Sequence, residues 1–125
     1  KLADLFLDTL PYNAGTTASD ALWSGLPVLT QAGNSFVGRM ASSLLENIGL
    51  PELIAHSSKE YKQIAVELAT NRDNLLAIKQ RLIANKSITS LFNPGSFARS
   101  LESAYQKIFD RYCAGLSPED VYVQS

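Results

Sequence analysis

The first 55 residues alternate short apolar runs with helix-like segments, and this alternation limits the folds open to the chain. The apolar runs, at residues 2–9, 27–30 and 53–55, are predicted to be short buried strands. The segments between them, residues 17–24 and 35–48, are predicted to be helices that end at glycines. Strands that alternate with helices are typical of a parallel sheet with crossover helices. We therefore expect an α/β fold.

The second half of the chain is predicted to be helical. Ser57 and Glu60 have the spacing of a capping box, and Asn71 or Asp73 can cap the next helix. The residues expected to face inward on that next helix are Leu75, Leu76, Leu82 and Ile83. A last helix, over residues 96–114, carries an apolar stripe that is expected to be core or an interface with an upstream domain. The stripe consists of Phe97, Leu101, Tyr105, Ile108, Phe109 and Tyr112.

The predicted domain covers residues 1–115, and residues 116–125 are expected to be a tail because they show no periodicity. An apolar run lies within a few residues of Lys1, and three short strands make a small sheet for 125 residues. We therefore expect the domain to be incomplete on its N-terminal side and the chain to be part of a longer polypeptide.

Composition excludes some partners and favours one compartment. The 11 basic and 12 acidic residues nearly cancel and form no basic run, so a nucleic-acid partner is not expected. No apolar stretch reaches the roughly 20 residues that cross a bilayer, so no membrane partner is expected. Cys113 is the single cysteine and has no partner for an internal disulfide, which favours the cytoplasm.

The loop after the first predicted strand carries the candidate chemistry. In an open parallel sheet, ligands bind beyond the carboxyl ends of the strands. Gly15 lets the backbone approach a ligand, and Thr16 and Thr17 add hydroxyl donors to the free amides of a helix start, which together favour a phosphate. Asp20 suits a neutral group with donors, such as a ribose diol. A capped helix start without any ligand is the alternative interpretation.

Other polar residues give weaker indications. His56, the single histidine, is expected to be a surface residue, and no His, Cys or Asp cluster has the spacing of a metal site. Arg39 could approach a ligand or form a structural salt bridge. Trp23 is expected to pack in the core against the sheet. Lys79, Arg81 and Lys86 are predicted to form a solvated helix face.

Residues 3–30 resemble the O-GlcNAc transferase/SPINDLY family of glycosyltransferases, above all in Asn-Ala-Gly-Thr-Thr followed by Asp-Ala-Leu-Trp-Ser-Gly-Leu-Pro-Val. Residues 39–45, 51–55 and 90–93 and the helix of Tyr61 also look like the family, so the resemblance runs from about residue 3 to 115. It implies the C-terminal Rossmann-like domain of a GT-B glycosyltransferase.

The resemblance also implies roles for individual residues. Gly15, Thr16 and Thr17 correspond to the family's His-Thr-Thr loop for the donor diphosphate, and Asp20 to its ribose-binding aspartate. Gly15 departs from the family's histidine, so backbone contacts are kept and any side-chain role is lost. Catalytic residues are expected upstream of this chain, which alone should be inactive.

The implied reaction is an inverting, metal-independent transfer of a sugar from a nucleotide sugar to Ser or Thr of a protein acceptor. UDP-GlcNAc is the leading donor, although SPINDLY-type members use GDP-fucose. An N-terminal glycosyltransferase domain and tetratricopeptide (TPR) helical repeats are expected in the same polypeptide. A sugar epimerase or non-protein glycosyltransferase of the GT-B class, or a non-catalytic interaction domain, remain alternatives.

Overall fold

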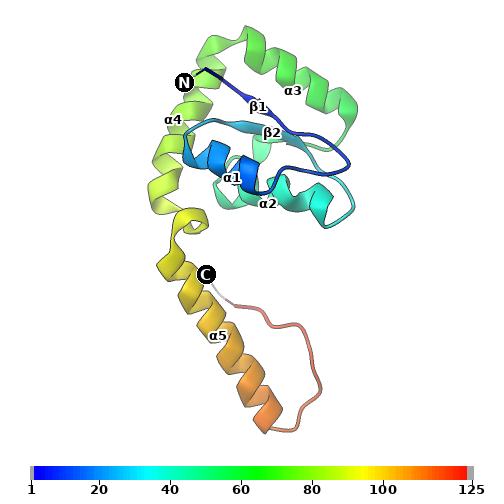
Figure 1. The fold of residues 1–125 in the computed structure, drawn as a ribbon, viewed down its shortest axis with the longest axis vertical. Coiled ribbons are helices and arrows are strands. Elements are labelled where there is room, and N and C mark those ends of the chain that lie inside the picture. The colour runs from blue at the N-terminus through cyan, green and yellow to red at the C-terminus, as the bar shows by residue number, and fades with distance from the viewer. Residues whose placement is uncertain (1, 124–125) are drawn as a thin grey trace. The chain divides into compact units, whose positions relative to one another are not determined.

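The computed structural model, which describes residues 2–123, contains a three-stranded parallel sheet in the order β1-β2-β3. Figure 1 labels β1 and β2 of this sheet. The strands are β1 (Phe6–Leu7), β2 (Val28–Gln31) and β3 (Ile54–Ala55). Phe6 pairs with Val28, and Thr30 pairs with Ile54. The α/β class and the parallel sheet predicted from the sequence are confirmed, although β1 is much shorter than the predicted strand over residues 2–9.

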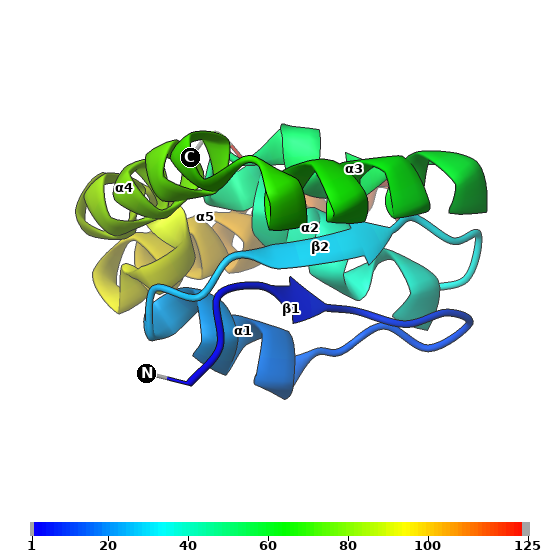
Figure 2. The same ribbon diagram turned by 90° about the horizontal axis from the view of Figure 1, so that it is seen from above.

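Helices connect the strands and cover both faces of the sheet. Helix α1 (Thr16–Trp23) joins β1 to β2. The segment between β2 and β3 contains the 3₁₀ turn η1 (Val37–Arg39), helix α2 (Met40–Asn47) and the 3₁₀ turn η2 (Pro51–Leu53). Helices α1 and α2 lie on one side of the sheet and α3 (Ser58–Thr70) on the other (Figure 2). The predicted helix over residues 35–48 therefore begins as a 3₁₀ turn.

The remaining helices are α4 (Arg72–Ile88) and α5 (Pro94–Cys113), with the 3₁₀ turn η3 (Ser90–Phe92) between them. The predicted caps are confirmed: Ser57 accepts a hydrogen bond from the Glu60 N–H at 3.2 Å, and Asn71 rather than Asp73 caps α4. The Glu60 carboxylate accepts from the His56 N–H at 2.7 Å, one residue before the position that a capping box predicts.

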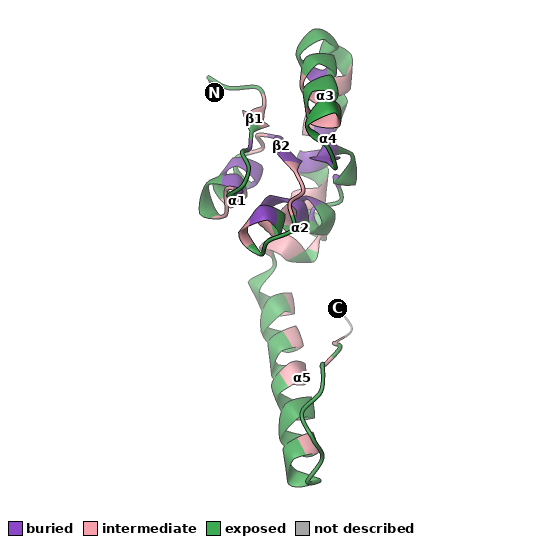
Figure 3. Cartoon of the chain, turned by 90° about the vertical axis from the view of Figure 1, so that its right-hand side faces the viewer, coloured by how far each residue is buried: buried purple, intermediate pink, exposed green. Residues whose placement is uncertain are grey.

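The hydrophobic core lies between the sheet and the helices (Figure 3). Its buried members are Ala18, Ala21, Leu22, Val28, Ala41, Leu45, Ile48, Leu50, Leu53, Ile54, Leu68, Ile78 and Leu82. On α4, Leu76 and Ile83 are exposed, so their predicted inward orientation is wrong. Because the buried face of α4 follows Ile78 and Leu82, positions 76 and 83 fall toward the opposite side of the helix.

Trp23 is 58% exposed, which corrects its predicted place in the core. Its indole ring meets the Phe92 ring edge-on, with centroids 5.2 Å apart, and the Lys86 ammonium lies 4.5 Å from the centre of the indole. Lys86 also donates to the Trp23 carbonyl. Trp23 ends α1, where it reaches η3 and α4 instead of the sheet, so it joins helices at the surface.

The chain forms two compact units, one ending at Phe92 and the other beginning at Asn93. In the second unit no residue of α5 is buried, and its apolar stripe is exposed, from Leu101 at 38% to Tyr112 at 80%. The stripe therefore forms no core within the described residues, and its role as an interface stays a prediction. Residues after Gly115 form no helix or strand up to residue 123, and Arg111 holds them through Glu119 at 2.7 Å. The expected domain boundary at residue 115 stays a prediction.

Candidate functional site

The loop between β1 and α1 leaves the start of a helix without a cap. Gly15 occupies the N-cap position with φ −93° and ψ −87°, and no side chain accepts a hydrogen bond from the first turn. The Ser19 N–H donates to the Gly15 carbonyl at 3.0 Å and closes the first turn. The N–H groups before Ser19 have no acceptor inside the helix, and they carry the positive end of its dipole. This helix start is therefore suited to an anion.

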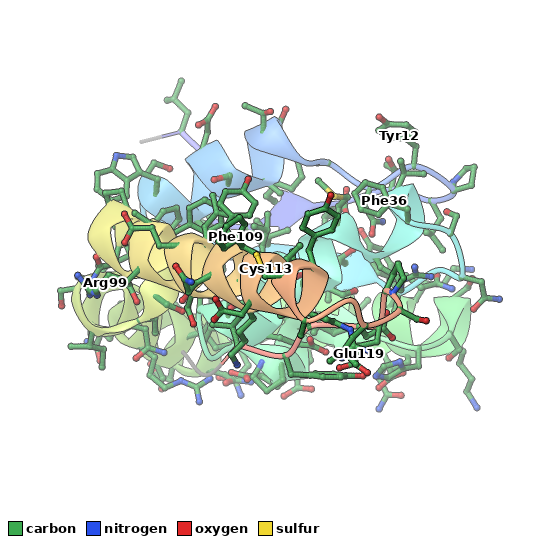
Figure 4. The ribbon with its side chains drawn as sticks, turned by 90° about the horizontal axis from the view of Figure 1, so that it is seen from below. Tyr12, Phe36, Arg99, Phe109, Cys113 and Glu119 are labelled. Carbon is green, nitrogen blue, oxygen red and sulfur yellow. The ribbon has the colours of Figure 1, made fainter. Side chains whose placement is uncertain are left out.

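The uncapped start of α1 opens onto a hollow of about 520 Å³. Its lining residues are Phe6, Leu7, Asp8, Thr9, Tyr12, Asn13, Ala14, Gly15, Thr16, Thr17, Phe36, Val37 and Met40. The loop supplies one wall, and η1 with the start of α2 supplies the other. Tyr12 and Phe36 are aromatic lining residues, exposed by 69% and 73%, and both are labelled in Figure 4.

The structure brings three of the four predicted site residues together. Gly15, Thr16 and Thr17 all line the hollow, and the two threonines are exposed. Asp20 does not line it: this residue is exposed in the second turn of α1, four positions after Thr16. Residues four apart share a helix face, so Asp20 lies one turn further along α1 on the same face as Thr16.

Met40 occupies the space beside Gly15. A Cβ atom at Gly15 would lie 3.2 Å from the Met40 Cε atom. The φ of Gly15 is negative, so no left-handed conformation requires glycine here. A small residue at this position leaves room for the flexible methionine side chain in the wall of the hollow.

Asp8 holds the loop between β1 and α1 in place through hydrogen bonds, a role that the sequence did not indicate. It is 5% exposed and directly follows β1. One carboxylate oxygen accepts from the Ala14 N–H at 2.8 Å, and the other accepts from the Thr30 hydroxyl at 2.6 Å. The Asp8 carbonyl accepts from the Tyr61 hydroxyl at 2.7 Å. The available sequence signal was an acidic residue placed immediately after an apolar strand.

Asn13 ties the same loop to the opposite wall. Its backbone N–H donates to the Val37 carbonyl at 3.0 Å, and its side-chain amide donates to the Thr9 carbonyl at 3.0 Å. The side chain is fully buried, and its Oδ1 atom has no hydrogen-bond partner. Asn13 therefore fixes the turn that carries Ala14 toward the start of α1.

The other predicted candidates lie outside the hollow. Arg39 donates to the Asn34 carbonyl at 2.5 Å and so closes its own loop, which supports a structural role without a salt bridge. His56 is exposed, as expected. The predicted solvated face of α4 holds ion pairs, because Lys79 bonds to Asp4 at 2.5 Å and lowers the pKa of that carboxyl, and Arg81 pairs with Glu52.

Within residues 2–123, no three His, Cys, Asp or Glu side chains are grouped so that they could hold a metal ion. Over the same part of the chain, no helix has the length and apolar character needed to span a membrane.

Comparison with known proteins matches nearly the whole chain. The sequence profile described as "Glycosyl transferase family 41" matches residues 1–101. A probable UDP-N-acetylglucosamine–peptide N-acetylglucosaminyltransferase SPINDLY from Hordeum vulgare is 37% identical over 94% of this chain and 12% of that protein. A UDP-N-acetylglucosamine–peptide N-acetylglucosaminyltransferase from Caenorhabditis elegans is 34% identical over 93% of this chain and 10% of that protein.

A solved structure shows the same fold. An O-GlcNAc transferase variant from Thermobaculum terrenum matches with a TM-score of 0.82 and 38% identity, over 90% of this chain and 22% of that one. Fold and sequence together define the glycosyltransferase class. The chain belongs to glycosyl transferase family 41, and its relatives are of the O-GlcNAc transferase and SPINDLY type. It spans about an eighth of the length of the SPINDLY relatives that it matches.

Proposed function

We propose that this chain holds the donor diphosphate in a glycosyltransferase that moves a sugar, with UDP-GlcNAc as the leading donor, to Ser or Thr of a protein acceptor. The observation that carries the proposal is the uncapped start of α1, with Thr16 and Thr17 beside a hollow at the carboxyl edge of the sheet. Family membership supports a nucleotide sugar as the anion.

The main chemical role falls to the first turn of α1. As the sugar leaves, negative charge develops on the diphosphate, and the backbone amides and hydroxyls of Thr16 and Thr17 stabilise it. Loss of one such donor typically costs about 3 kcal/mol in the barrier. Gly15 adds a backbone contact only, because it has no side chain to replace the family's histidine.

Asp20 is proposed to hold the ribose. A carboxylate close to the diphosphate would repel it, and Asp20 lies outside the hollow, one turn further along α1. From there its oxygens can accept hydrogen bonds from the two hydroxyls of a ribose that follows the diphosphate. The phosphates at the helix start and the ribose one turn away match the order of groups in a nucleoside diphosphate.

The rest of the enzyme is proposed to lie in the same, longer polypeptide. An upstream glycosyltransferase domain would supply the catalytic groups, and TPR repeats would bind the acceptor. We expect a cytoplasmic, metal-independent enzyme, and we expect the 125-residue chain alone to be inactive. Sugar transfer by the isolated chain would show that the catalytic centre is not divided in this way.

Calorimetric titration of the full-length protein with UDP, GDP, their sugar derivatives and pyrophosphate tests the proposal. Asp20→Ala should weaken UDP binding about 10- to 100-fold, because a hydrogen-bonded charge is lost, and should leave pyrophosphate binding nearly unchanged. Asp73→Ala, at an exposed carboxylate in the first turn of α4, is the matched control and should bind both ligands normally.

Two outcomes would contradict the proposal. If no nucleoside diphosphate binds to the full-length protein, the donor-site assignment is wrong. If Asp20→Ala weakens UDP and pyrophosphate equally, Asp20 supports the loop and does not hold the ribose.

A further inference from the structure

Asp8 is a buried carboxylate with no cationic partner. It is 5% exposed, and within residues 2–123 no Lys, Arg or His forms a salt bridge with it. Burial of a charge is unfavourable unless hydrogen bonds compensate for the lost water. Here the compensation comes from one backbone N–H and one hydroxyl, those of Ala14 and Thr30. These two hydrogen bonds therefore stabilise the buried carboxylate, and an apolar residue in its place would leave both donors without an acceptor.

The partners of Asp8 belong to three different elements. Ala14 lies in the loop before α1, Thr30 lies on β2 and is fully buried, and Tyr61 lies on α3. The bonds to Thr30 and Tyr61 fix Asp8 relative to the sheet and to α3. The remaining carboxylate oxygen then fixes the direction of the Ala14 N–H.

Fixing Ala14 determines how the next residues present their amides. The Ala14 N–H donates to the buried Asp8 carboxylate, so it points toward the interior of the protein. Gly15 and Thr16 follow directly, and both line the hollow. The start of α1 and the loop that lines the hollow are therefore fixed relative to each other before a ligand binds. Donors that are already in position can stabilise a developing charge without first having to reorganise.

The geometry points to Asp8 as a positioning residue of the donor site, one that aligns the start of α1 with a bound diphosphate through the Ala14 N–H; this rests on the proposed function. The negative charge of Asp8 works against an anion in the hollow, so its contribution lies in the hydrogen bond. Asn at this position can accept from the Ala14 N–H with Oδ1 and donate to the Thr30 hydroxyl with Nδ2. Asp8→Asn therefore retains the geometry while removing the charge.

The test compares three variants of the full-length enzyme. Asp8→Ala should weaken UDP and pyrophosphate binding equally, by about 10-fold or more, because the diphosphate part is misaligned. Asp8→Asn should bind both ligands within about 3-fold of wild type. Asn71→Ala, the matched control, removes a cap from α4 away from the hollow, so it should lower the unfolding temperature and leave binding nearly unchanged.

A kinetic measurement separates positioning from general destabilisation. Asp8→Ala should lower kcat as well as kcat/KM for the donor, because the charge on the departing diphosphate meets misaligned amides, and Asp8→Asn should restore both. The inference is overturned if Asp8→Ala binds like wild type, if Asn71→Ala and Asp8→Ala lose affinity alike, or if Asp8→Asn is as defective as Asp8→Ala.

Amide hydrogen exchange gives a readout that needs no ligand. The Ala14 N–H should exchange slowly in wild type and in Asp8→Asn, and faster in Asp8→Ala. If Asp8→Ala does not fold, Asp8→Asn carries the test, and rapid exchange of its Ala14 N–H overturns the inference. If exchange follows the expected pattern but wild type binds neither UDP nor pyrophosphate, the donor-site proposal fails while the positioning of Ala14 by Asp8 stands.

Discussion

Helix α1 begins differently from helices α3, α4 and α5. Ser57, Asn71 and Asn93 precede the latter three, and each accepts a hydrogen bond from an N–H in the first turn, at 3.2, 3.1 and 3.0 Å. Gly15 precedes α1 and offers no side chain for this purpose. The same chain therefore contains helix starts that are capped by side chains and, at α1, a start without such a cap beside a hollow. Helix α2 also has no side-chain cap, but it continues directly from the 3₁₀ turn η1.

The capped helix starts contribute to stability, whereas the open start of α1 is available for ligand binding. A capping side chain satisfies an N–H group that water or a ligand would otherwise bind, and it stabilises the helix by about 1 kcal/mol. An open start gives up this stabilisation and keeps its amides free for an anion. Serine and asparagine caps in α3, α4 and α5 thus serve the fold, and Gly15 with Thr16 and Thr17 is available to a ligand.

The largest effect on ligand binding is expected when α1 is given a charged side-chain cap. Gly15→Asp places a carboxylate where it can accept from the first-turn amides and repel a diphosphate. We expect UDP affinity to fall about 100-fold, because hydrogen bonds to a charged group contribute about 1.5 to 3 kcal/mol each. Calorimetry of the full-length protein measures the effect. Gly15→Ala adds a Cβ close to Met40 without a charge, and equal UDP affinity in the two variants would refute the role of the open start.

Removing the cap of α4 tests whether a capped helix start affects stability without affecting ligand binding. Asn71→Ala should reduce the free energy of unfolding by about 1 kcal/mol, because the Asn74 N–H loses its acceptor. UDP affinity should not change. Urea unfolding followed by circular dichroism measures the stability. Asp73→Ala in the same turn serves as the control and should cost less, and a loss of UDP affinity in Asn71→Ala would show that capped helices also shape the donor site.

Tyr61 connects a capped helix to the uncapped one. It lies on α3, and its hydroxyl donates to the carbonyl of Asp8, which holds the loop before α1. Burial, and then the charge of Asp8, raise the pKa of the Tyr61 hydroxyl above its ordinary value of 10.0. The folded protein holds this proton more tightly than the unfolded chain does. The resulting stability is complete below the ordinary pKa and is lost as pH rises through the folded pKa.

The smallest expected effect follows from this link. Tyr61→Phe should reduce the free energy of unfolding by about 0.5 to 1 kcal/mol at neutral pH, because one hydrogen bond is lost. The variant should also lose less stability than wild type between pH 9 and pH 11, on the order of one pH unit either side of the ordinary pKa of tyrosine. Urea unfolding across this range measures both changes. An unchanged alkaline slope would mean that Tyr61 ionises equally in both states.

Local signals in the sequence were sufficient for the fold. The order of strands and helices, the Ser57 cap and the end of α1 before Gly25 depend on residues a few positions apart, and the structure confirms them. Gly25 has φ +81°, a conformation that few residues other than glycine adopt. The length of β1 could not be predicted from neighbouring residues, because it depends on pairing with β2, and only Phe6 and Leu7 pair with that strand.

The wrong predictions concern side chains whose surroundings come from distant segments. The sequence predicts that Trp23 packs in the core against the sheet, although its neighbours are Lys86 and Phe92, more than 60 residues away. Asp8 was not identified, because its acidic side chain gives no sign of the threonine on the next strand. For the candidate site, Gly15, Thr16 and Thr17 line the hollow, and their role as a diphosphate site stays a prediction.

The spacing of the Asp8 partners has a consequence for how the protein folds. Ala14, Thr30 and Tyr61 lie 6, 22 and 53 positions from Asp8 along the chain. Contacts between distant residues form late, because long stretches of chain must first lose conformational entropy. The start of α1 should therefore gain its final arrangement only after β2 and α3 have docked. Appearance of pyrophosphate binding during refolding would then report the last step of assembly, later than the recovery of helical circular dichroism.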